Sequence, residues 1–264
     1  MMIVEQMIKN AQTPLLHIAD VSGSALFQGD CLDIMPLIPD KSVQLVLADL
    51  PYGTTACKWD TIIPFEPLWK QYKRIIKDNG AIVLTASQPF TTKLISSNYE
   101  MFKYEWIWDK RNVTGHLTAK FMPMKQHESI LVFGNKKIIY NPQFETISEN
   151  DYRYSSKGRV SKTKLNTVYG DIFGDRQKET GKRFPKSILQ VINSNSVGKQ
   201  HPTQKPLELM KYLILTYSNE NDMVLDNTMG SGTTCLAAKE LNRKFIGIEK
   251  EPKYYEISCK RCGF

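Results

Sequence analysis

The tetrapeptide Asp49-Leu50-Pro51-Tyr52 carries groups that could assist chemistry on an aromatic amine. Such an amine is a poor nucleophile because its lone pair is delocalised into the ring. A carboxylate that accepts one of its hydrogens stabilises the developing positive charge, and Asp49 supplies that carboxylate. The backbone carbonyl of Leu50 can accept the second hydrogen, while Tyr52 can stack on a base rotated out of a duplex. A Pro-Tyr-Gly turn with no function is the alternative reading of this stretch.

A second candidate site is a glycine loop that runs from a predicted strand into a predicted helix, with the sequence Asp226-Asn227-Thr228-Met229-Gly230-Ser231-Gly232-Thr233-Thr234. Glycine lets the backbone approach a ligand, and a helix N-terminus offers free N–H groups. Glu249 ends the next predicted strand, where an acidic side chain can accept hydrogen bonds from ribose hydroxyls. A dinucleotide site would need a third glycine where this chain has Cys235. The loop therefore predicts a mononucleoside-like ligand.

The elements around these motifs alternate short apolar runs with amphipathic stretches, which is typical of a parallel sheet flanked by helices. One further helix carries Leu68, Tyr72, Ile75 and Ile76 and is predicted to end at 78–80. Open α/β sheets bind ligands at the carboxyl ends of their strands, and the strand at 43–48 delivers Asp49 to that edge. Predicted strands cover 25–29, 43–48, 81–85, 104–108, 129–133, 223–225 and 244–248, and the other predicted helices cover 32–38, 206–217 and 233–241.

Charge is concentrated in one part of the chain. The net charge of +8 suggests a polyanionic partner, and the stretch 134–205 alone holds fourteen Lys or Arg against six Asp or Glu. Residues 135–200 are basic and sparsely periodic, which predicts a recognition insert or long loops within one domain spanning 1–264. A solvated lysine-rich loop is the alternative. Candidate contacts to DNA phosphates or bases are Arg153, Lys157, Arg159, Lys162, Lys164, Lys182, Arg183 and Lys186.

Neither a disulfide framework nor a metal site is expected. The five cysteines form an odd set with no framework spacing, and no secretory signal precedes them, which favours reduced thiols in a cytoplasm. Cys259 and Cys262 have the spacing of a zinc knuckle, but tetrahedral zinc needs four ligands and the chain has no second pair. No apolar run approaches the roughly 20 residues that span a bilayer, so no membrane partner is expected.

Taken together, these motifs resemble those of the prokaryotic and phage amino-methyltransferases of DNA. The catalytic motif of that family is usually Asp-Pro-Pro-Tyr, and its cofactor motif is a Phe-x-Gly-x-Gly loop. The catalytic motif comes first here, which is similar to the beta arrangement, with the target-recognition insert between the two motifs. The stretch His-Pro-Thr-Gln-Lys-Pro at 201–206 is similar to the segment that precedes the cofactor loop. The similarity spans 27–249.

The resemblance implies a Rossmann-like fold of S-adenosyl-L-methionine (SAM)-dependent methyltransferases, with a mostly parallel twisted sheet, helices on both faces and a circularly permuted motif order. It implies that Asp49, Leu50, Pro51 and Tyr52 are catalytic. Asp30 would accept a hydrogen bond from the cofactor adenine, although a strand-end aspartate can also cap the next helix. The residues implied to bind SAM are Asp30, Cys31, Lys205, Asp226, Met229, Gly230, Gly232, Thr233, Thr234 and Glu249.

Two residues depart from the family pattern. Leu50 stands in place of the first proline, but its carbonyl remains and the following Pro51 favours an extended geometry at Leu50. Met229 stands where Phe is frequent, and it keeps an apolar, polarisable contact. Asp rather than Ser at position 49 favours adenine, since the resembling cytosine enzymes more often carry Ser there.

The predicted activity is site-specific transfer of a methyl group from SAM to the N6 amine of adenine in DNA. The alternatives are cytosine-N4 methylation, methylation of RNA or of a protein glutamine, and a catalytically silent DNA-binding protein. The expected partners are double-stranded DNA and, in a restriction-modification system, a cognate endonuclease. We expect a monomer or homodimer in the cytoplasm of a prokaryotic or phage-infected cell, while the recognised DNA sequence is not predictable.

Overall fold

The computed structural model of the chain describes residues 3–11, 15–19, 23–55, 57, 60–146, 166–167, 170–171, 182–192 and 204–264. The chain divides into two compact units. The core unit consists of Met1–Asn141 and Ser187–Phe264, and the insert unit is Pro142–Lys186. Both candidate motifs belong to the core unit.

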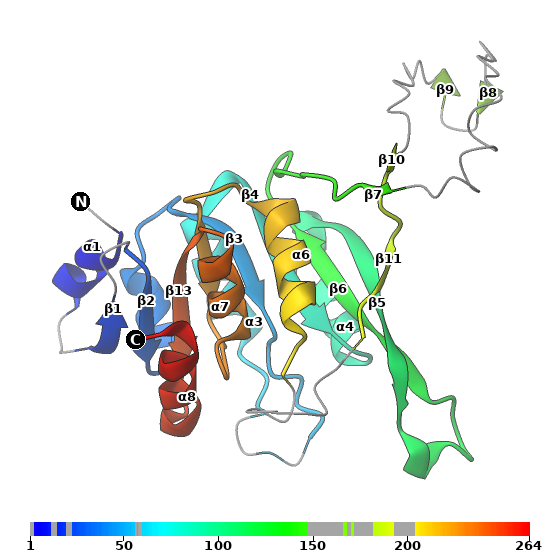
Figure 1. The fold of residues 1–264 in the computed structure, drawn as a ribbon, viewed down its shortest axis with the longest axis horizontal. Helices are drawn as coiled ribbons and strands as arrows, with labels where there is room; N and C mark the ends of the chain where they lie inside the picture. Colours follow the sequence, from blue (N-terminus) through cyan, green and yellow to red (C-terminus); the bar gives the residue numbers. More distant parts are fainter. Residues whose placement is uncertain are drawn as a thin grey trace. The chain divides into compact units, whose positions relative to one another are not determined.

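A nine-stranded sheet forms the centre of the core unit, in the order β1-β2-β13-β12-β3-β4-β6-β5-β11 (Figure 1). Strands β2, β13, β12, β3 and β4 are mutually parallel, and β11 is parallel to β5. Strand β1 pairs antiparallel with β2, and β6 pairs antiparallel with both β4 and β5. The strands are β1 (Leu16–Ala19), β2 (Ala25–Gln28), β3 (Val43–Ala48), β4 (Ile76–Ala86), β5 (Phe102–Thr114), β6 (Lys125–Phe133), β11 (Ile188–Gln190), β12 (Met223–Asp226) and β13 (Lys244–Glu249).

Helices cover both faces of this sheet. Helices α1 to α4 contribute to one buried apolar cluster, and α6, α7 and α8 contribute to a second cluster on the opposite face (Figure 1). This arrangement confirms the predicted α/β fold of a methyltransferase. The helices are α1 (Ile3–Asn10), α2 (Cys31–Ile34), α3 (Phe65–Ile75), α4 (Phe90–Ser97), α6 (Leu207–Tyr217), α7 (Thr233–Glu240) and α8 (Pro252–Cys262), with 3-10 turns η1 (Met35–Leu37), η2 (Tyr99–Met101) and η3 (His116–Thr118).

Strand β3 shows why the sheet places the first motif where it does. All six of its residues are buried, as expected for a central parallel strand that is covered on both faces. Its one polar side chain, Gln44, donates to the carbonyl oxygen of Asn79 at 3.2 Å, which satisfies the buried amide. The strand ends at Ala48, so Asp49 is the first residue beyond the carboxyl end of the sheet.

The predicted end of the helix at 78–80 is wrong. Helix α3 ends at Ile75, and β4 begins at Ile76. Val43 pairs with Ile76 and Leu45 pairs with Ala81, so the residues between these pairs form a bulge on β4. A Cβ atom at Gly80 would lie 2.8 Å from the Gln44 carbonyl oxygen, so the close approach of the two backbones requires glycine there.

Other elements also differ from the prediction. The helix expected at 32–38 is α2 followed by the 3-10 turn η1, where Pro36 lacks the N–H that an α-helix would use. Strands β5 and β6 extend well beyond the predicted 104–108 and 129–133, and they form a hairpin that projects from the sheet (Figure 1). The stretch 135–199 also contributes β11, which pairs with β5.

The insert unit contains two short antiparallel pairs, β7 (Glu145–Thr146) with β10 (Lys182–Arg183) and β8 (Asn166–Thr167) with β9 (Gly170–Asp171). The rings of Phe144 and Phe184 lie 4.9 Å apart between centroids, and the Lys182 ammonium is 5.7 Å from the Phe144 ring. Across the described residues, no helix is both long enough and apolar enough to cross a membrane.

Candidate active site

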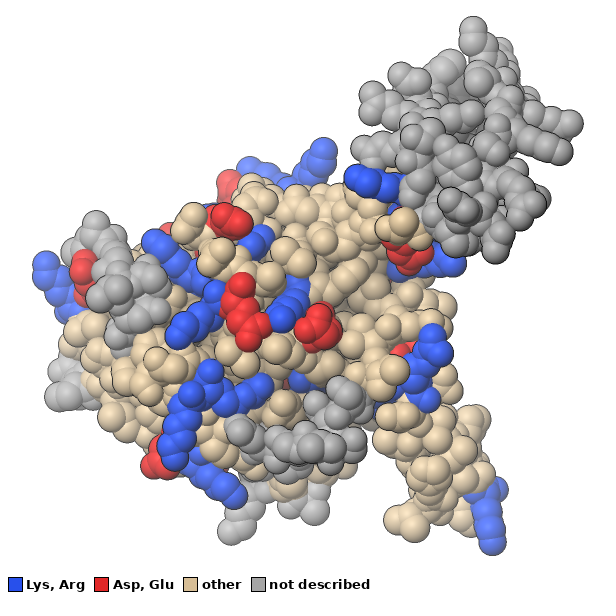
Figure 2. Space-filling model, in the orientation of Figure 1, with Lys and Arg blue, Asp and Glu red and all other residues tan. Residues whose placement is uncertain are grey.

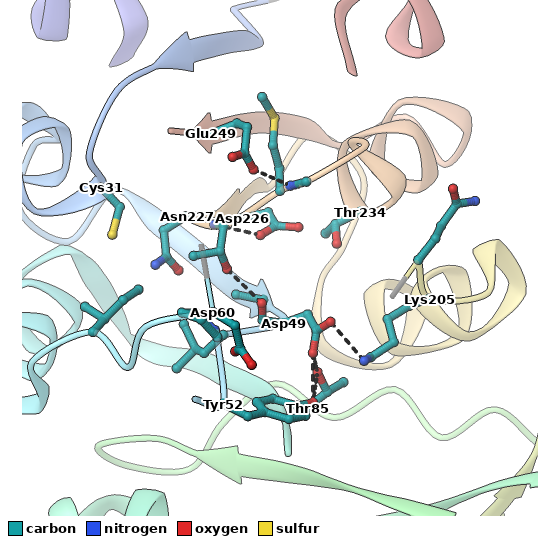
Figure 3. Close-up of a pocket in the computed structure, with 18 of the residues that line it drawn as sticks. Cys31, Asp49, Tyr52, Asp60, Thr85, Lys205, Asp226, Asn227, Thr234 and Glu249 are labelled. Atoms are coloured by element: carbon teal, nitrogen blue, oxygen red, sulfur yellow. Dashed lines mark hydrogen bonds and ion pairs between the residues drawn. The ribbon is translucent and has the colours of Figure 1, made fainter. Parts of the chain in front are cut away.

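A pocket of about 810 Å³ opens at the carboxyl ends of β2, β3, β12 and β13, a size typical of small-molecule and cofactor sites. Both motifs line it, although they are far apart in the sequence (Figure 3). The predicted site residues that line it are Asp30, Cys31, Asp49, Leu50, Pro51, Tyr52, Lys205, Asp226, Met229, Gly230, Thr233, Thr234 and Glu249. Gly232 does not line the pocket.

The carboxylate of Asp49 is held by two hydroxyl groups on one of its oxygens. Tyr52 donates to Asp49 Oδ1 at 2.8 Å, and Thr85 donates to the same atom (Figure 3). Strand pairing explains the contact with Thr85, because Ala48 pairs with Leu84 and the next residue on each strand lies alongside the other. Burial and the Asp49 charge raise the pKa of the Tyr52 hydroxyl well above its usual range, so this group remains a neutral donor.

The ring of Tyr52 and the loop that follows it are also fixed. The Phe90 ring stacks on the Tyr52 ring with centroids 5.0 Å apart and 23° between the planes. Asp60 accepts backbone N–H bonds from Gly53, Thr54 and Thr55 at 2.9, 2.9 and 2.7 Å. Burial alone would raise the pKa of Asp60, but these bonds and one from the Thr55 side chain outweigh it and lower the pKa. The hydrogen bonds to Asp60 fix the loop after Tyr52, and the stacking on Phe90 fixes its ring, so Tyr52 is held in one orientation.

The other oxygen of Asp49 pairs with a lysine whose side chain is only 10% exposed. Lys205 Nζ lies 2.9 Å from Asp49 Oδ2 and 3.1 Å from Glu128 Oε2, and Lys110 Nζ lies 3.2 Å from Glu128 Oε1. Lys205 is thus placed beside the catalytic motif, although the sequence predicts that it binds the cofactor. Because Lys205 also lines the pocket, the cofactor assignment stays a prediction.

The glycine loop closes the opposite side of the pocket. Glu249 Oε2 accepts the backbone N–H of Gly230 at 2.8 Å, and Oε1 accepts that of Glu251 at 2.8 Å (Figure 3). Gly230 and Gly232 have φ angles of +51° and +75°, a region that favours glycine. A Cβ atom at Gly232 would also come within 2.8 Å of the Ser258 side chain on α8. Gly232 therefore shapes the loop and its packing on α8.

Two acidic side chains beside the loop have distinct environments. Burial raises the pKa of Asp226 to about 7. Hydrogen bonds from Thr234 and from the Thr228 backbone N–H lower the pKa, but they do not offset the burial. Asp30 Oδ1 caps α2 by accepting the Leu32 N–H at 2.9 Å, and Oδ2 pairs with Lys250 at 3.1 Å. The capping alternative for Asp30 is therefore correct, and its predicted contact with the cofactor adenine remains open because the side chain also lines the pocket.

The remaining loop residues pack against neighbouring helices. Thr233 Oγ1 accepts a hydrogen bond from Arg261 Nη1 on α8 at 3.0 Å, and Thr234 Oγ1 lies 3.6 Å from the sulfur of Met210 on α6. Met229 is buried, and a Cβ atom at Gly247 would meet its sulfur at 2.4 Å. The contacts of Thr233 and Thr234 hold the first turn of α7 against α8 and α6.

The chemistry of the pocket fits SAM. Carboxylates lie at the carboxyl ends of four neighbouring strands: Asp30 and Asp49 follow β2 and β3, and Asp226 and Glu249 are the last residues of β12 and β13. Apart from its own carboxylate, SAM presents a sulfonium, an ammonium, ribose hydroxyls and an adenine amine, which are cationic or can donate hydrogen bonds. Asp226 would hold the cationic methionine part, and Glu249 would hold the ribose. SAM supplies the methyl group that is transferred.

The cysteines are thiols in the structure. Cys31 lines the pocket, and burial raises its pKa to about 11, which disfavours a reactive thiolate. Cys259 and Cys262 lie in α8, where burial raises the pKa of Cys262 to about 11 as well. Within the described part of the chain, no group of three His, Cys, Asp or Glu side chains is arranged to hold a metal ion.

The predicted DNA contacts belong to the insert unit. Lys182, Arg183 and Lys186 are exposed. Arg183 pairs with Glu145 across the β7–β10 ladder. The other five predicted contacts lie outside the described residues, namely Arg153, Lys157, Arg159, Lys162 and Lys164. Their role in DNA binding stays a prediction.

Sequence reasoning missed Thr85, Glu128, Lys110, Phe90 and Asp60. Thr85 could have been found, because it is the last residue of a predicted strand and the carboxyl ends of parallel strands meet. Glu128 and Lys110 flank predicted strands, but their meeting depends on the register that pairs Trp108 with Glu128. Phe90 and Asp60 give no comparable signal.

Comparisons with known proteins agree with this geometry. A family model described as DNA methylase, which covers N6-adenine and N4-cytosine enzymes, matches residues 43–260. The type II methyltransferase M1.MboII of Moraxella bovis is 29% identical over 252 residues, covering 87% of this chain and 92% of that protein. The type II methyltransferase M.HinfI of Haemophilus influenzae is 28% identical over 266 residues, covering 90% of this chain and 68% of that protein.

Solved structures match the fold. The M1.HpyAVI–SAM complex has a TM-score of 0.62 at 24% identity, with 90% of this chain and 98% of that chain covered. The cytosine-N4-specific PvuII DNA methyltransferase also has a TM-score of 0.62, at 17% identity and with 90% and 85% covered.

Proposed function

The chain belongs to the DNA methylase family that includes N6-adenine and N4-cytosine methyltransferases, and on that premise we propose that it methylates the N6 amine of adenine. It is a SAM-dependent DNA methyltransferase of prokaryotic type. The family includes enzymes for both bases, so the choice of adenine is the proposal, and it is argued from Asp49 and the residues around it.

The observation that carries the proposal is the position of Asp49 between the two sides of the pocket. Its carboxylate lies beside Tyr52 and Thr85, and its own backbone carbonyl accepts a hydrogen bond from Thr228 of the cofactor loop. A base amine on Asp49 would therefore sit next to the loop that holds the methyl donor. The carboxylate and the Leu50 carbonyl would accept the two amine hydrogens and stabilise the positive charge that develops at nitrogen.

Tyr52 supports the binding of an extrahelical base. Phe90 stacks on the Tyr52 ring, and the Lys205 ammonium lies 5.7 Å from the centroid of the same ring, so the ring is held in one position. Base stacking on an aromatic side chain offsets part of the cost of unstacking the base from the duplex, which is a few kcal/mol.

The β5–β6 hairpin, residues 102–133, offers a surface for the duplex in the core unit. Thr114 and Lys125 at the base of its tip line the pocket. Leu117 and Phe121 at the tip are 98% and 85% exposed. Figure 2 shows the hairpin mainly in tan with a basic end, whereas acidic and basic side chains are interspersed over the rest of the face in view. Apolar tips with basic flanks suit insertion between bases.

We also infer the setting of the reaction. The homology to type II methyltransferases supports a role in restriction-modification with a cognate endonuclease, in the cytoplasm of a prokaryotic or phage-infected cell. The protein would act as a monomer or homodimer on double-stranded DNA, with the basic insert contacting phosphates.

Sequencing the DNA of a host that expresses the chain, with a method that distinguishes N6-methyladenine from N4-methylcytosine, tests the proposal and yields the recognised site. We expect N6-methyladenine at one motif, and none with Asp49→Ala. N4-methylcytosine would overturn the choice of base. Labelled methyl transfer to RNA or to a protein glutamine, with none to DNA, would overturn the DNA substrate. DNA binding without SAM binding or transfer would indicate a silent protein.

A further inference from the structure

Four charged side chains form an alternating row that ends on Asp49. Its members are Asp49, Lys205, Glu128 and Lys110, with successive N···O distances of 2.9, 3.1 and 3.2 Å. The side chains are 26%, 10%, 16% and 10% exposed in that order. The row therefore has two negative and two positive charges, and it contributes no net charge to the pocket.

Mutual pairing keeps the inner members of this row charged. Burial by itself would lower the pKa of Lys205, but the carboxylates of Asp49 and Glu128 raise it well above its usual range. Burial likewise opposes the charge of Glu128, yet the ammonium groups of Lys205 and Lys110 hold its pKa below the usual range. Removing one member leaves a buried charge without its partner, so Lys205 cannot leave Asp49 unless another carboxylate receives it.

Both oxygens of the Asp49 carboxylate already have a donor. Oδ1 accepts from the hydroxyls of Tyr52 and Thr85, and Oδ2 is paired with Lys205. A base amine needs one of these oxygens. The two hydroxyls also contact each other at 3.2 Å and are anchored on the Tyr52 loop and β4. Lys205 differs from them because its ammonium already has a second carboxylate within reach.

We propose that Lys205 occupies Asp49 Oδ2 in the ligand-free enzyme in place of the base amine, and that Glu128 is the positioning residue that retains Lys205 when the amine arrives. The ammonium and the amine both donate N–H bonds to a carboxylate, so one can replace the other on Oδ2. No covalent bond changes in this exchange. The inference rests on the proposed function in that the incoming group is a base amine.

Glu128 is well placed to receive the lysine. Its Oε1 is held by Lys110, and the pairing of Trp108 with Glu128 puts Lys110 two residues further along β5, on the same face of the strand as Trp108. The Glu128 carboxylate therefore stays in place when Lys205 moves. Lys205 gives up one of two carboxylate contacts, and Asp49 exchanges a charged donor for a neutral one.

The test uses duplex DNA carrying 2-aminopurine at the target position, whose fluorescence rises when the base leaves the stack, and enzyme without SAM. With Glu128→Gln, Lys205 has only Asp49 as a charged partner, so we expect the fluorescence increase to fall at least about fivefold. We expect kcat with SAM to fall by about tenfold or more. Removing the lysine as well, in Lys205→Met/Glu128→Gln, is expected to restore at least half of the wild-type fluorescence increase.

This restoration separates exchange from a purely structural role. If the row only holds the Asp49 side chain in its conformation, the fluorescence increase of the double variant will be no larger than that of Glu128→Gln. That result would overturn the proposal. Should Glu128→Gln fail to fold, Lys205→Met alone decides, because exchange requires a fluorescence increase no smaller than that of the wild type. A smaller increase would overturn it.

A matched control comes from an ion pair outside the pocket. Lys211 on α6 pairs with Glu240 on α7 at 2.8 Å, so Glu240→Gln makes the same chemical change without touching the row. It should leave fluorescence and kcat within about twofold of wild type. Melting temperatures and SAM binding by calorimetry report folding in every variant. If the choice of adenine is wrong, the wild-type enzyme will methylate cytosine. The comparison among these variants tests the exchange of Lys205 separately.

Discussion

Thr228 donates its hydroxyl to the backbone carbonyl oxygen of Asp49 at 3.1 Å, and this bond joins the cofactor loop directly to the catalytic tetrapeptide. The Thr228 backbone N–H is in turn bound to Asp226 Oδ1 at 3.1 Å. The two motifs are separated by most of the chain, yet β3 and β12 are adjacent parallel strands, with Val224 paired with Leu45. The spacing between the glycine loop and the Asp49–Tyr52 tetrapeptide is thus set by neighbouring strand ends.

Substitution of Thr228 tests this link. Thr228→Val keeps the shape of the side chain but leaves the Asp49 carbonyl without its donor, so we expect kcat to fall about tenfold, the equivalent of one hydrogen bond of about 1.4 kcal/mol. Thr228→Ser restores the hydroxyl and should recover most of the rate. Steady-state kinetics with SAM and DNA varied separately measures the effect. Equal rates in the Val and Ser variants would contradict a role for the hydroxyl.

Tyr52 combines two roles that can be separated by substitution. Tyr52→Phe removes the hydroxyl that donates to Asp49 but keeps the ring stacked on Phe90, so we expect kcat to fall about tenfold with little change in the KM for DNA. Tyr52→Ala also removes the stacking platform. We expect it to raise the KM for DNA by a further factor of about 5 to 150, since stacking a base is worth about 1–3 kcal/mol.

The control for Tyr52 is the KM for SAM, which should remain within about threefold in both variants. Identical kinetics for Phe and Ala at position 52 would show that the ring does not hold the base. The prediction for stacking would then be wrong, while the contribution of the hydroxyl could still stand.

Buried Asp226 makes the stability of the ligand-free enzyme depend on pH. Its pKa of about 7 in the folded protein exceeds its ordinary value of 3.8, so folding favours the protonated form. The resulting stability is fully present below pH 3.8 and is lost as pH rises through 7. Asp226→Asn cannot ionise and should therefore unfold at higher temperature than wild type at pH 8.5. The difference in free energy of unfolding is expected to reach at most about 4 kcal/mol.

The difference between Asp226→Asn and wild type should shrink toward pH 5, where the wild-type carboxyl is largely protonated. Thermal unfolding between pH 5 and 8.5 measures it. A negative Asp226 attracts a cationic ligand, so SAM affinity of the wild type should increase between pH 6 and 8 while that of the Asn variant changes little. A pH-independent difference in unfolding would contradict the raised pKa of Asp226.

The parts that the sequence predicts well are those set by local pattern. Buried β3 and the apolar start of β12 locate Asp49 and Asp226 at strand ends, because a continuous apolar run must lie inside a covered sheet. The end of α3 was misplaced because Asp78, Asn79 and Gly80 are typical of a helix end, whereas here they form a bulge in β4. Residue type alone does not distinguish these two uses.

The row of charges beside Asp49 shows what local pattern does not contain. Lys110 and Glu128 meet because β5 and β6 pair antiparallel in one register, and Lys205 reaches them from the segment before α6. A shift of one residue in that register would place Glu128 on the other face of the strand. Long-range strand pairing therefore decides the electrostatics of the site.

The tip of the β5–β6 hairpin provides the last prediction. Leu117 and Phe121 are almost fully exposed, which is costly unless a partner covers them, and the base of the tip lines the pocket. If they enter the duplex beside the target base, Leu117→Ala/Phe121→Ala should weaken DNA binding about tenfold or more. The 2-aminopurine fluorescence should decrease in parallel, while SAM affinity and the melting temperature stay within error of wild type.

Tyr99 supplies the control for this surface. It is 74% exposed in η2 and does not line the pocket, so Tyr99→Ala removes a comparable apolar side chain without affecting the hairpin tip. Its DNA affinity should equal that of the wild type in the same salt, a condition that matters because phosphate contacts are salt-dependent. The double hairpin variant should retain the wild-type salt dependence, since it removes no charge. Unchanged DNA binding by that variant would exclude the tip from the interface and leave recognition to the insert unit.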